Sequence, residues 1–170
     1  LAGKPKTADP YAVPFLPELH RLGAFRERTR IKTEAKTKIA RHAVSLIRPE
    51  DTLLLDSSSS SWFLARQLPE IDLTVVTPSI SIIQVLMPRP SIRLVGLGGD
   101  FSVAEESFFG EMTGKQLNNK NIDTLFFSCQ GFERDTGIYT SSEAHASLLR
   151  QMFLVARRVV LLADSTKRGQ

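Results

Sequence analysis

A run of serines after a short apolar segment has the residue types that bind an anion. Residues 52–56 are mostly apolar and end in Asp56, and Ser57, Ser58, Ser59 and Ser60 follow at once. Hydroxyls and backbone amides at a turn from strand to helix form a group of donors, and the helix dipole adds a partial positive charge there. We expect a phosphate group at this turn. The same serines could instead serve only to cap a helix.

A second segment of this kind closes the sequence. Asp164 and Lys167 follow residues 158–163, which are apolar except for Arg158. An ammonium group pairs with phosphate, while a carboxylate accepts hydrogen bonds from sugar hydroxyls. The pattern therefore indicates a site for a molecule with both groups, although a surface turn would have the same residues.

Other polar or glycine residues stand where further strands are expected to end. Ligands of open parallel sheets bind outside the carboxyl ends of the strands, so these residues are candidates for the same site. They are Thr77 and Ser79, Gly98 and Gly99, Gln130 and Gly131.

Metal, thiol and acid–base chemistry have little support in the sequence. Cys129 is the only cysteine and lies in an apolar run, which is typical of a buried packing thiol, and the three histidines are far apart. We expect no metal and no cofactor. Glu143 and His145 are two residues apart on an expected helix and should therefore face different ways. Glu143 fits the helix start, as a cap that could also reach the ligand.

Apolar segments alternate with amphipathic ones along the chain. Such strands, apolar throughout, are typical of a parallel sheet that helices cover on both faces, so we expect an α/β fold with a mostly parallel sheet. Residues 108–110 fit a strand or a turn, and Thr140 with Glu143 has the spacing of a capping box. The pattern predicts helices at 33–47, 62–68, 80–87, 113–119 and 142–156, and strands at 52–56, 73–77, 92–97, 122–128 and 158–163.

Composition favours one cytoplasmic domain. The 170 residues are 42% apolar, enough for one sizeable core, and no apolar run approaches the roughly 20 residues that a membrane helix needs. Residues 1–23 have no sustained period and are expected to be a linker to a domain at 24–170. The net charge of +4 is dispersed, which favours solvated faces and an anion site over a DNA surface.

Taken in order, these segments resemble the effector domain of DeoR-family transcriptional regulators, from about residue 25 to residue 169. Residues 55–60 are similar to the family's Asp-x-Gly-Thr-Thr loop, and residues 162–167 are very similar to its Leu-Ala-Asp-Ser-Ser-Lys. Three residues depart from the family pattern, all in the expected cleft. Ser58 and Ser128 stand where the family has glycine, and Pro78 stands where it has asparagine.

The resemblance implies a fold shared with ribose-phosphate isomerase, glucosamine-phosphate deaminase and CoA-transferases. It also implies a homo-oligomeric sensor, a repressor rather than an enzyme, that binds a phosphorylated sugar. Its effector would control DNA binding by a helix-turn-helix module preceding this chain, and Arg28 and Lys36 would complete the site or transmit its state.

Two alternatives remain at this point. One is a sugar-phosphate isomerase or deaminase of the same fold, with Asp56 or Asp164 as its base. The other is an oligomerisation module that has lost its ligand, an idea motivated by Ser58 and Pro78.

Overall fold

A five-stranded parallel sheet forms the centre of the domain. The computed structural model describes residues 25–134, 137–140 and 142–169. All four strand pairings within the sheet are parallel, which confirms the expected fold class. The strands lie in the order β3 (Ile92–Gly96), β2 (Leu73–Thr77), β1 (Thr52–Leu55), β6 (Ile122–Phe127) and β9 (Ala156–Leu161).

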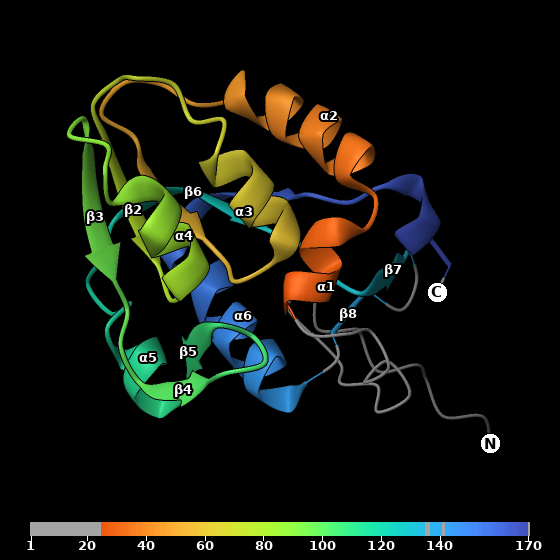
Figure 1. Cartoon of the computed structure of the whole chain (residues 1–170). Helices are drawn as coiled ribbons and strands as arrows, with labels where there is room; N and C mark the ends of the chain where they lie inside the picture. The colour runs from red at the N-terminus through yellow and green to blue at the C-terminus, as the bar shows by residue number, and fades with distance from the viewer. Residues whose placement is uncertain (1–24, 135–136, 141, 170) are drawn as a thin grey trace.

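Helices cover both faces of this sheet (Figure 1). On one face lie α2 (Thr33–Val44), α3 (Ser59–Ala65) and α4 (Ile80–Leu86), and on the other lie α5 (Glu111–Lys115) and α6 (Glu143–Val155). Successive strand residues point to opposite faces: Leu53 and Leu55 are buried in the core beneath α2, α3 and α4, whereas Leu54 is buried in the core beneath α6.

Several boundaries differ from the predicted ones for local reasons. The helix expected from residue 62 begins at Ser59, because the Ser58 hydroxyl caps it by accepting a bond from the Ser61 amide. The predicted capping box at Thr140 is wrong: the cap of α6 is Ser142, whose hydroxyl accepts from the His145 amide. Serine is a preferred residue at the N-cap of a helix, which explains why the helices begin after Ser58 and Ser142.

Two hairpins lie outside the central sheet. One joins β4 (Asp100–Ser102) to β5 (Ser107–Phe109), and the other joins β7 (Gly131–Glu133) to β8 (Gly137–Tyr139). The turn predicted at residues 98–100 thus leads into a strand, and residues 131–133 and 137–139 form strands where a loop was expected. Each hairpin has strands of three residues, too short for a sequence period of two to be visible.

The first described helix, α1 (Phe25–Arg30), packs against the turn between β4 and β5. Phe25 is buried, its amide donates to the Ala104 carbonyl at 3.0 Å, and its ring meets Trp62 edge-on. Arg26 pairs with Glu106 in the same turn. The expected linker, residues 1–23, lies outside the described residues.

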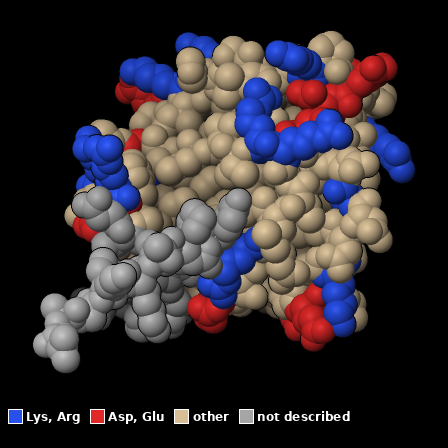
Figure 2. All heavy atoms as spheres, turned by 180° about the vertical axis from the view of Figure 1, so that it is seen from behind, with Lys and Arg blue, Asp and Glu red and all other residues tan. Residues whose placement is uncertain are grey.

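Charge is spread over the surface. On the face seen in Figure 2, lysine and arginine side chains are scattered and mostly stand beside aspartate or glutamate. This face therefore has the dispersed charge that the sequence predicts. None of the helices in the described parts of the chain is long and apolar enough to cross a membrane.

Candidate functional site

The candidate site lies where the strand order changes direction. From β1 the chain adds β2 and β3 on one side, and then β6 and β9 on the other, so β1 and β6 are neighbours at the switch. Loops leaving their carboxyl ends diverge there and leave a crevice, the usual ligand position in open parallel sheets. Asp56 follows β1 and Ser128 follows β6.

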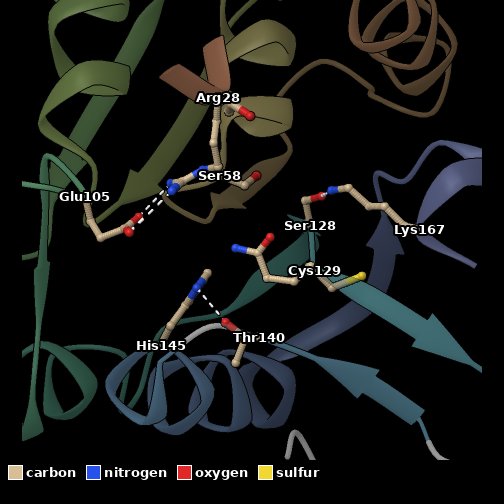
Figure 3. A pocket seen from close by; sticks show the side chains of 10 residues that line it. Arg28, Ser58, Glu105, Ser128, Cys129, Thr140, His145 and Lys167 are labelled. Atoms are coloured by element: carbon tan, nitrogen blue, oxygen red, sulfur yellow. Dashed lines mark hydrogen bonds and ion pairs between the residues drawn. The ribbon is translucent and has the colours of Figure 1, made fainter. Parts of the chain in front are cut away.

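Two adjoining pockets, which we together call the cleft, occupy this position. Both are lined by Arg28, Ser59, Gln130 and Lys167. The inner pocket (Figure 3) is completed by Ser58, Glu105, Ser128, Cys129, Thr140 and His145, and the outer pocket by Glu27, Ile31, Lys32, Lys36, Asp164 and Thr166. All four lysine and arginine side chains of the cleft thus lie in the outer pocket or at its boundary with the inner one.

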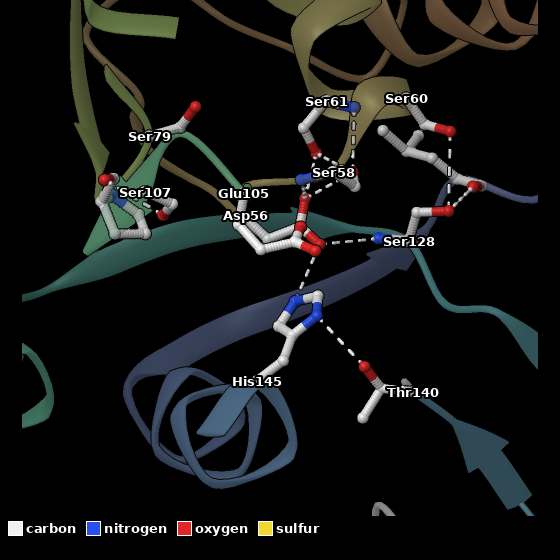
Figure 4. A network of polar contacts seen from close by, with 12 residues as sticks. Asp56, Ser58, Ser60, Ser61, Ser79, Glu105, Ser107, Ser128, Thr140 and His145 are labelled. Carbon is white, nitrogen blue, oxygen red and sulfur yellow. Dashed lines mark hydrogen bonds and ion pairs between the residues drawn. The ribbon is translucent and has the colours of Figure 1, made fainter. Parts of the chain in front are cut away.

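Asp56 shapes the cleft from behind without lining it. Its carboxylate is fully buried, and Oδ1 accepts from the amide and hydroxyl of Ser58, at 3.1 and 2.6 Å, and from the Ser61 hydroxyl at 2.5 Å (Figure 4). Oδ2 accepts from the Ser128 amide at 3.0 Å. Asp56 therefore connects residues 57–61, which we call the serine segment, to the end of β6.

Lys167 is held against the serine segment by a residue that departs from the family pattern. Its ammonium donates to the Ser128 hydroxyl at 2.6 Å, and that hydroxyl in turn donates to the Leu162 carbonyl at 2.7 Å. Burial lowers the pKa of Lys167. The hydroxyl at position 128, where glycine was expected, thus fixes the ammonium at the boundary of the two pockets.

Asp164 orients the turn that carries Lys167. It caps the single 3₁₀ turn Ser165–Lys167, because its carboxylate accepts from the Thr166 amide at 3.0 Å. The same carboxylate pairs with Lys32 at 3.4 Å. It lines the outer pocket and retains lone pairs that a ligand hydroxyl can use.

Lys36 connects the outer pocket to α1. The buried ammonium donates to the carbonyls of Arg28 and of Ile31, the latter at 2.9 Å, at the end of that helix. Burial, and then the nearby charges of Lys167 and Arg28, lower the pKa of Lys36 to about 8. Because an anion in the pocket would favour the protonated form, the site is suited to a negatively charged ligand.

Arg28 closes the cleft from the other side. The Arg28 side chain is 14% exposed, and its guanidinium donates to both carboxylate oxygens of Glu105, at 2.6 and 3.3 Å. Glu105 lies in the turn between β4 and β5, so this ion pair joins α1 to that hairpin. A carboxylate of the protein thus engages a guanidinium that is also suited to phosphate.

Some of the predicted site residues lie beside the cleft but do not line it. Ser57 and Ser60 are buried in the serine segment, and Gly131 opens β7 opposite Tyr139. The Ser60 hydroxyl lies 3.5 Å from that of Ser128. These residues support the lining from behind.

Four further candidates serve the fold near β2 and β3. The Thr77 hydroxyl accepts from the Ser79 amide at 3.2 Å, and Ser79 caps α4. Gly98 exchanges two hydrogen bonds with Gln116. A Cβ on Gly99, whose φ is 151°, would meet the Thr113 hydroxyl. In the described structure these residues are not part of the cleft lining.

Two other expectations are changed by the structure. Glu143 is exposed and pairs with Arg150 on the outside of α6, so it is not brought to the cleft. Pro78 was expected in the cleft, but its carbonyl accepts from Ser107 and from the Phe108 amide, which places it at β5.

His145, Glu105 and Thr140 line the inner pocket although they were not among the predicted site residues. The separation of His145 from Glu143 was correct, since the histidine points inward and the glutamate outward. A histidine among the apolar residues on the buried side of α6 was the sequence feature that could have indicated His145 as a site residue. Cys129 also lines the pocket, and burial raises the pKa of its thiol to about 11.

The sheet order and the helices on both faces define an α/β fold like that of ribose 5-phosphate isomerase. Ribose 5-phosphate isomerase a from Methanocaldococcus jannaschii matches with a TM-score of 0.58 and 18% identity, over 80% of this chain and 54% of that one. At this identity the likeness shows the fold alone.

The particular family follows from the sequence. Residues 31–170 match the DeoR C terminal sensor domain, and the chain belongs to this family. The L-fucose operon activator of Haemophilus influenzae is 36% identical over 143 residues, covering 84% of this chain and 57% of that protein. The HTH-type transcriptional repressor GlcR of Bacillus subtilis is 30% identical over 155 residues, covering 91% and 60%. The chain thus spans little more than half the length of these transcriptional regulators.

Proposed function

We propose that this domain binds a phosphorylated sugar or sugar derivative in the cleft and that, in the whole protein, the bound molecule controls DNA binding by a preceding helix-turn-helix module. One observation carries the proposal: four cationic side chains border a cleft whose inner end is lined by uncharged hydroxyl, amide and imidazole groups together with Glu105. These cations are Arg28, Lys32, Lys36 and Lys167.

The charge distribution gives the ligand an orientation. Its phosphate lies where the two pockets meet, between Lys167 and the serine segment at Ser58 and Ser59, and its carbon skeleton enters the inner pocket. Gln130 and Asp164 border this position and select among hydroxyl groups. Glu143 has no part in this version of the site, because its side chain lies outside the cleft.

Binding without turnover is supported by the state of the two carboxylates considered as bases. A base must lie within hydrogen-bond reach of the carbon acid. Asp56 is buried behind the serine segment with four donors on it, and Asp164 accepts from Thr166 and pairs with Lys32 through Oδ1, which stabilises its ionised form and makes it a weaker base. The named relatives are regulators as well. We therefore prefer a sensor to an isomerase or deaminase.

Arg28 and Lys36 provide a route from the ligand to the rest of the protein. Arg28 belongs to α1, and the Lys36 ammonium donates hydrogen bonds to the carbonyls of Arg28 and Ile31 at the end of that helix. A phosphate that attracts both side chains favours a different position of α1 from the one held by Glu105. A ligand shifts such an equilibrium only through its different affinity for the two arrangements.

Thermal unfolding against a panel of sugars tests the proposal. The panel pairs ribose 5-phosphate, glucose 6-phosphate and fructose 1-phosphate with the unphosphorylated sugars. A ligand at about 100 times its dissociation constant stabilises the folded state by about 2.7 kcal/mol. We expect a shift from a phosphorylated member only. If no member stabilises the domain, the sensor proposal fails and the oligomerisation module becomes the better explanation; rapid conversion of a member would favour the enzyme.

Lys36 should make binding depend on pH. Its pKa is about 8, so the charge is present below that pH and is lost above it. Affinity for a sugar phosphate is therefore expected to fall between about pH 7 and about pH 9.5, with proton uptake on binding near pH 8. Calorimetry in buffers of different ionisation enthalpy measures both. Lys36→Met should bind weakly and lack the step near pH 8; a step that persists in this variant would assign the titration to another group.

Glu105 should act as a competitor of the ligand. Because its carboxylate occupies the guanidinium of Arg28, Glu105→Gln is expected to strengthen sugar-phosphate binding by about two- to fivefold, the range of a partly exposed ion pair. Glu106→Gln is the matched control, since that carboxylate pairs with Arg26 and Ser81. Equal changes in the two variants, measured by calorimetry, would contradict a specific role for Glu105.

A further inference from the structure

His145 has a buried ring nitrogen without a hydrogen-bond partner among the described residues. Its side chain is 16% exposed, Nε2 is buried and unpartnered, and the ring lines the inner pocket. The nearest carboxylate oxygen, Oδ2 of Asp56, is 3.8 Å away, beyond hydrogen-bond distance. Leaving a buried polar atom without a hydrogen bond costs free energy, so a partner from outside the chain is favoured.

The ring itself is held firmly. Nδ1 lies 3.1 Å from the Thr140 hydroxyl (Figure 4). The ring also packs edge-on against Phe109, with the ring centroids 6.0 Å apart. With the neighbouring carboxylate of Asp56 on the Nε2 side, the favoured tautomer has its proton on Nε2, and Thr140 then donates to Nδ1. Nε2 is therefore oriented in advance as a donor.

Three hydroxyls that line the inner pocket already use their protons in bonds within the protein. Ser58 donates to Asp56, Ser128 donates to the Leu162 carbonyl, and Thr140 donates to the histidine ring. Of these four side chains, only His145 presents an unused donor. Burial lowers its pKa, with Asp56 and Glu105 opposing that effect and Arg28 adding to it, so the ring is neutral at pH 7.

We infer that Nε2–H of His145 donates a hydrogen bond to a hydroxyl or carbonyl oxygen on the carbon skeleton of the bound molecule and thereby makes the inner pocket selective for that oxygen. The inference rests on the proposed sugar-phosphate site and deepens it. A neutral donor contributes no charge to phosphate binding, so the role of His145 separates from that of Lys167.

The test compares a sugar phosphate with its own deoxy analogues. The probes are ribose 5-phosphate, glucose 6-phosphate, their single-deoxy forms and inorganic phosphate, with affinities measured by calorimetry on the whole chain. His145→Phe removes the donor and keeps a ring against Phe109. We expect this variant to bind the preferred sugar phosphate about tenfold more weakly, and inorganic phosphate unchanged. One deoxy form should bind wild type more weakly than its parent sugar phosphate does, whereas His145→Phe should bind this deoxy form and the parent with similar affinity.

The outcomes separate the two proposals. If neither phosphate nor any sugar phosphate binds wild type, the proposed function and this inference both fall. If sugar phosphates bind in a Lys167-dependent way but His145→Phe keeps every ratio between parent and deoxy form, the inference alone is overturned. Should the variant not fold, nitrogen NMR of wild type decides: ribose or glucose phosphate must move the Nε2–H signal of His145 more than inorganic phosphate does, and an unmoved signal overturns the inference.

Discussion

Replacing Lys167 by alanine is expected to remove half or more of the stabilisation of the domain by sugar phosphates. The ammonium lies at the boundary of the two pockets, held by Ser128, and a charge-assisted bond to phosphate in such a place contributes about 1.5–3 kcal/mol. The loss corresponds to about ten- to hundredfold in affinity. Thermal unfolding with the active member of the panel shows the loss directly, as a ligand-induced shift of the midpoint that is at most about half of the wild-type shift.

A matched lysine gives the control. Lys38 is on the exposed side of α2, pairs with Glu34 and is remote from the cleft lining. Lys38→Ala removes the same charge from the protein and should retain the full ligand-induced shift. Equal losses in the two variants would mean that overall charge, and not a site at Lys167, attracts the ligand.

Replacing Asp56 by alanine is expected to cause the largest loss of stability among the cleft residues. Four donors, from Ser58, Ser61 and Ser128, would lose a fully buried acceptor. Unsatisfied buried donors each cost about 1–3 kcal/mol, so a loss on the order of 3 kcal/mol or more follows even with partial rearrangement. That is a large fraction of the 5–15 kcal/mol typical of a folded domain. Urea unfolding followed by the fluorescence of Trp62 measures the change.

Asp56→Asn separates the acceptor role from simple packing. An asparagine oxygen in the Oδ1 position retains the three bonds from Ser58 and Ser61, whereas its amide meets the Ser128 N–H donor to donor. We expect a loss about half as large as that of Asp56→Ala. A stability close to wild type in Asp56→Ala would show that the serine segment finds other acceptors, and would remove Asp56 from the account of the cleft.

The fold could be predicted because each strand has its own local signal. Residues 73–77 are leucine, valine and threonine, which favour strands, and match β2, and the helical spacing after Thr33 matches α2 within one turn. Such patterns depend on neighbours along the chain. Hairpins of three-residue strands, such as β7 and β8, have too few residues for a period and were not predicted.

The site could be predicted only in part, because no single segment of the sequence determines the order of the strands in the sheet. Asp56, Ser128 and Lys167 meet because β1, β6 and β9 are adjacent, whereas Thr77 and Gly98 follow strands on the other side of β1. All of them stand at strand ends in the sequence. Which ends share a crevice depends on long-range pairing, and that requires the structure.

The helix α1 has a consequence that reaches beyond the cleft. Arg28 is at once a residue of this helix and a wall of the cleft, while Phe25 and Arg26 fasten the same helix to the turn between β4 and β5. Thermodynamic linkage is reciprocal: if occupancy of the cleft moves α1, then whatever restrains α1 must alter occupancy by the same factor. If, as proposed, a DNA-binding module precedes this helix in the whole protein, binding of DNA to that module would change the affinity of the cleft for its ligand, and ligand affinities measured without DNA would differ from those measured in its presence.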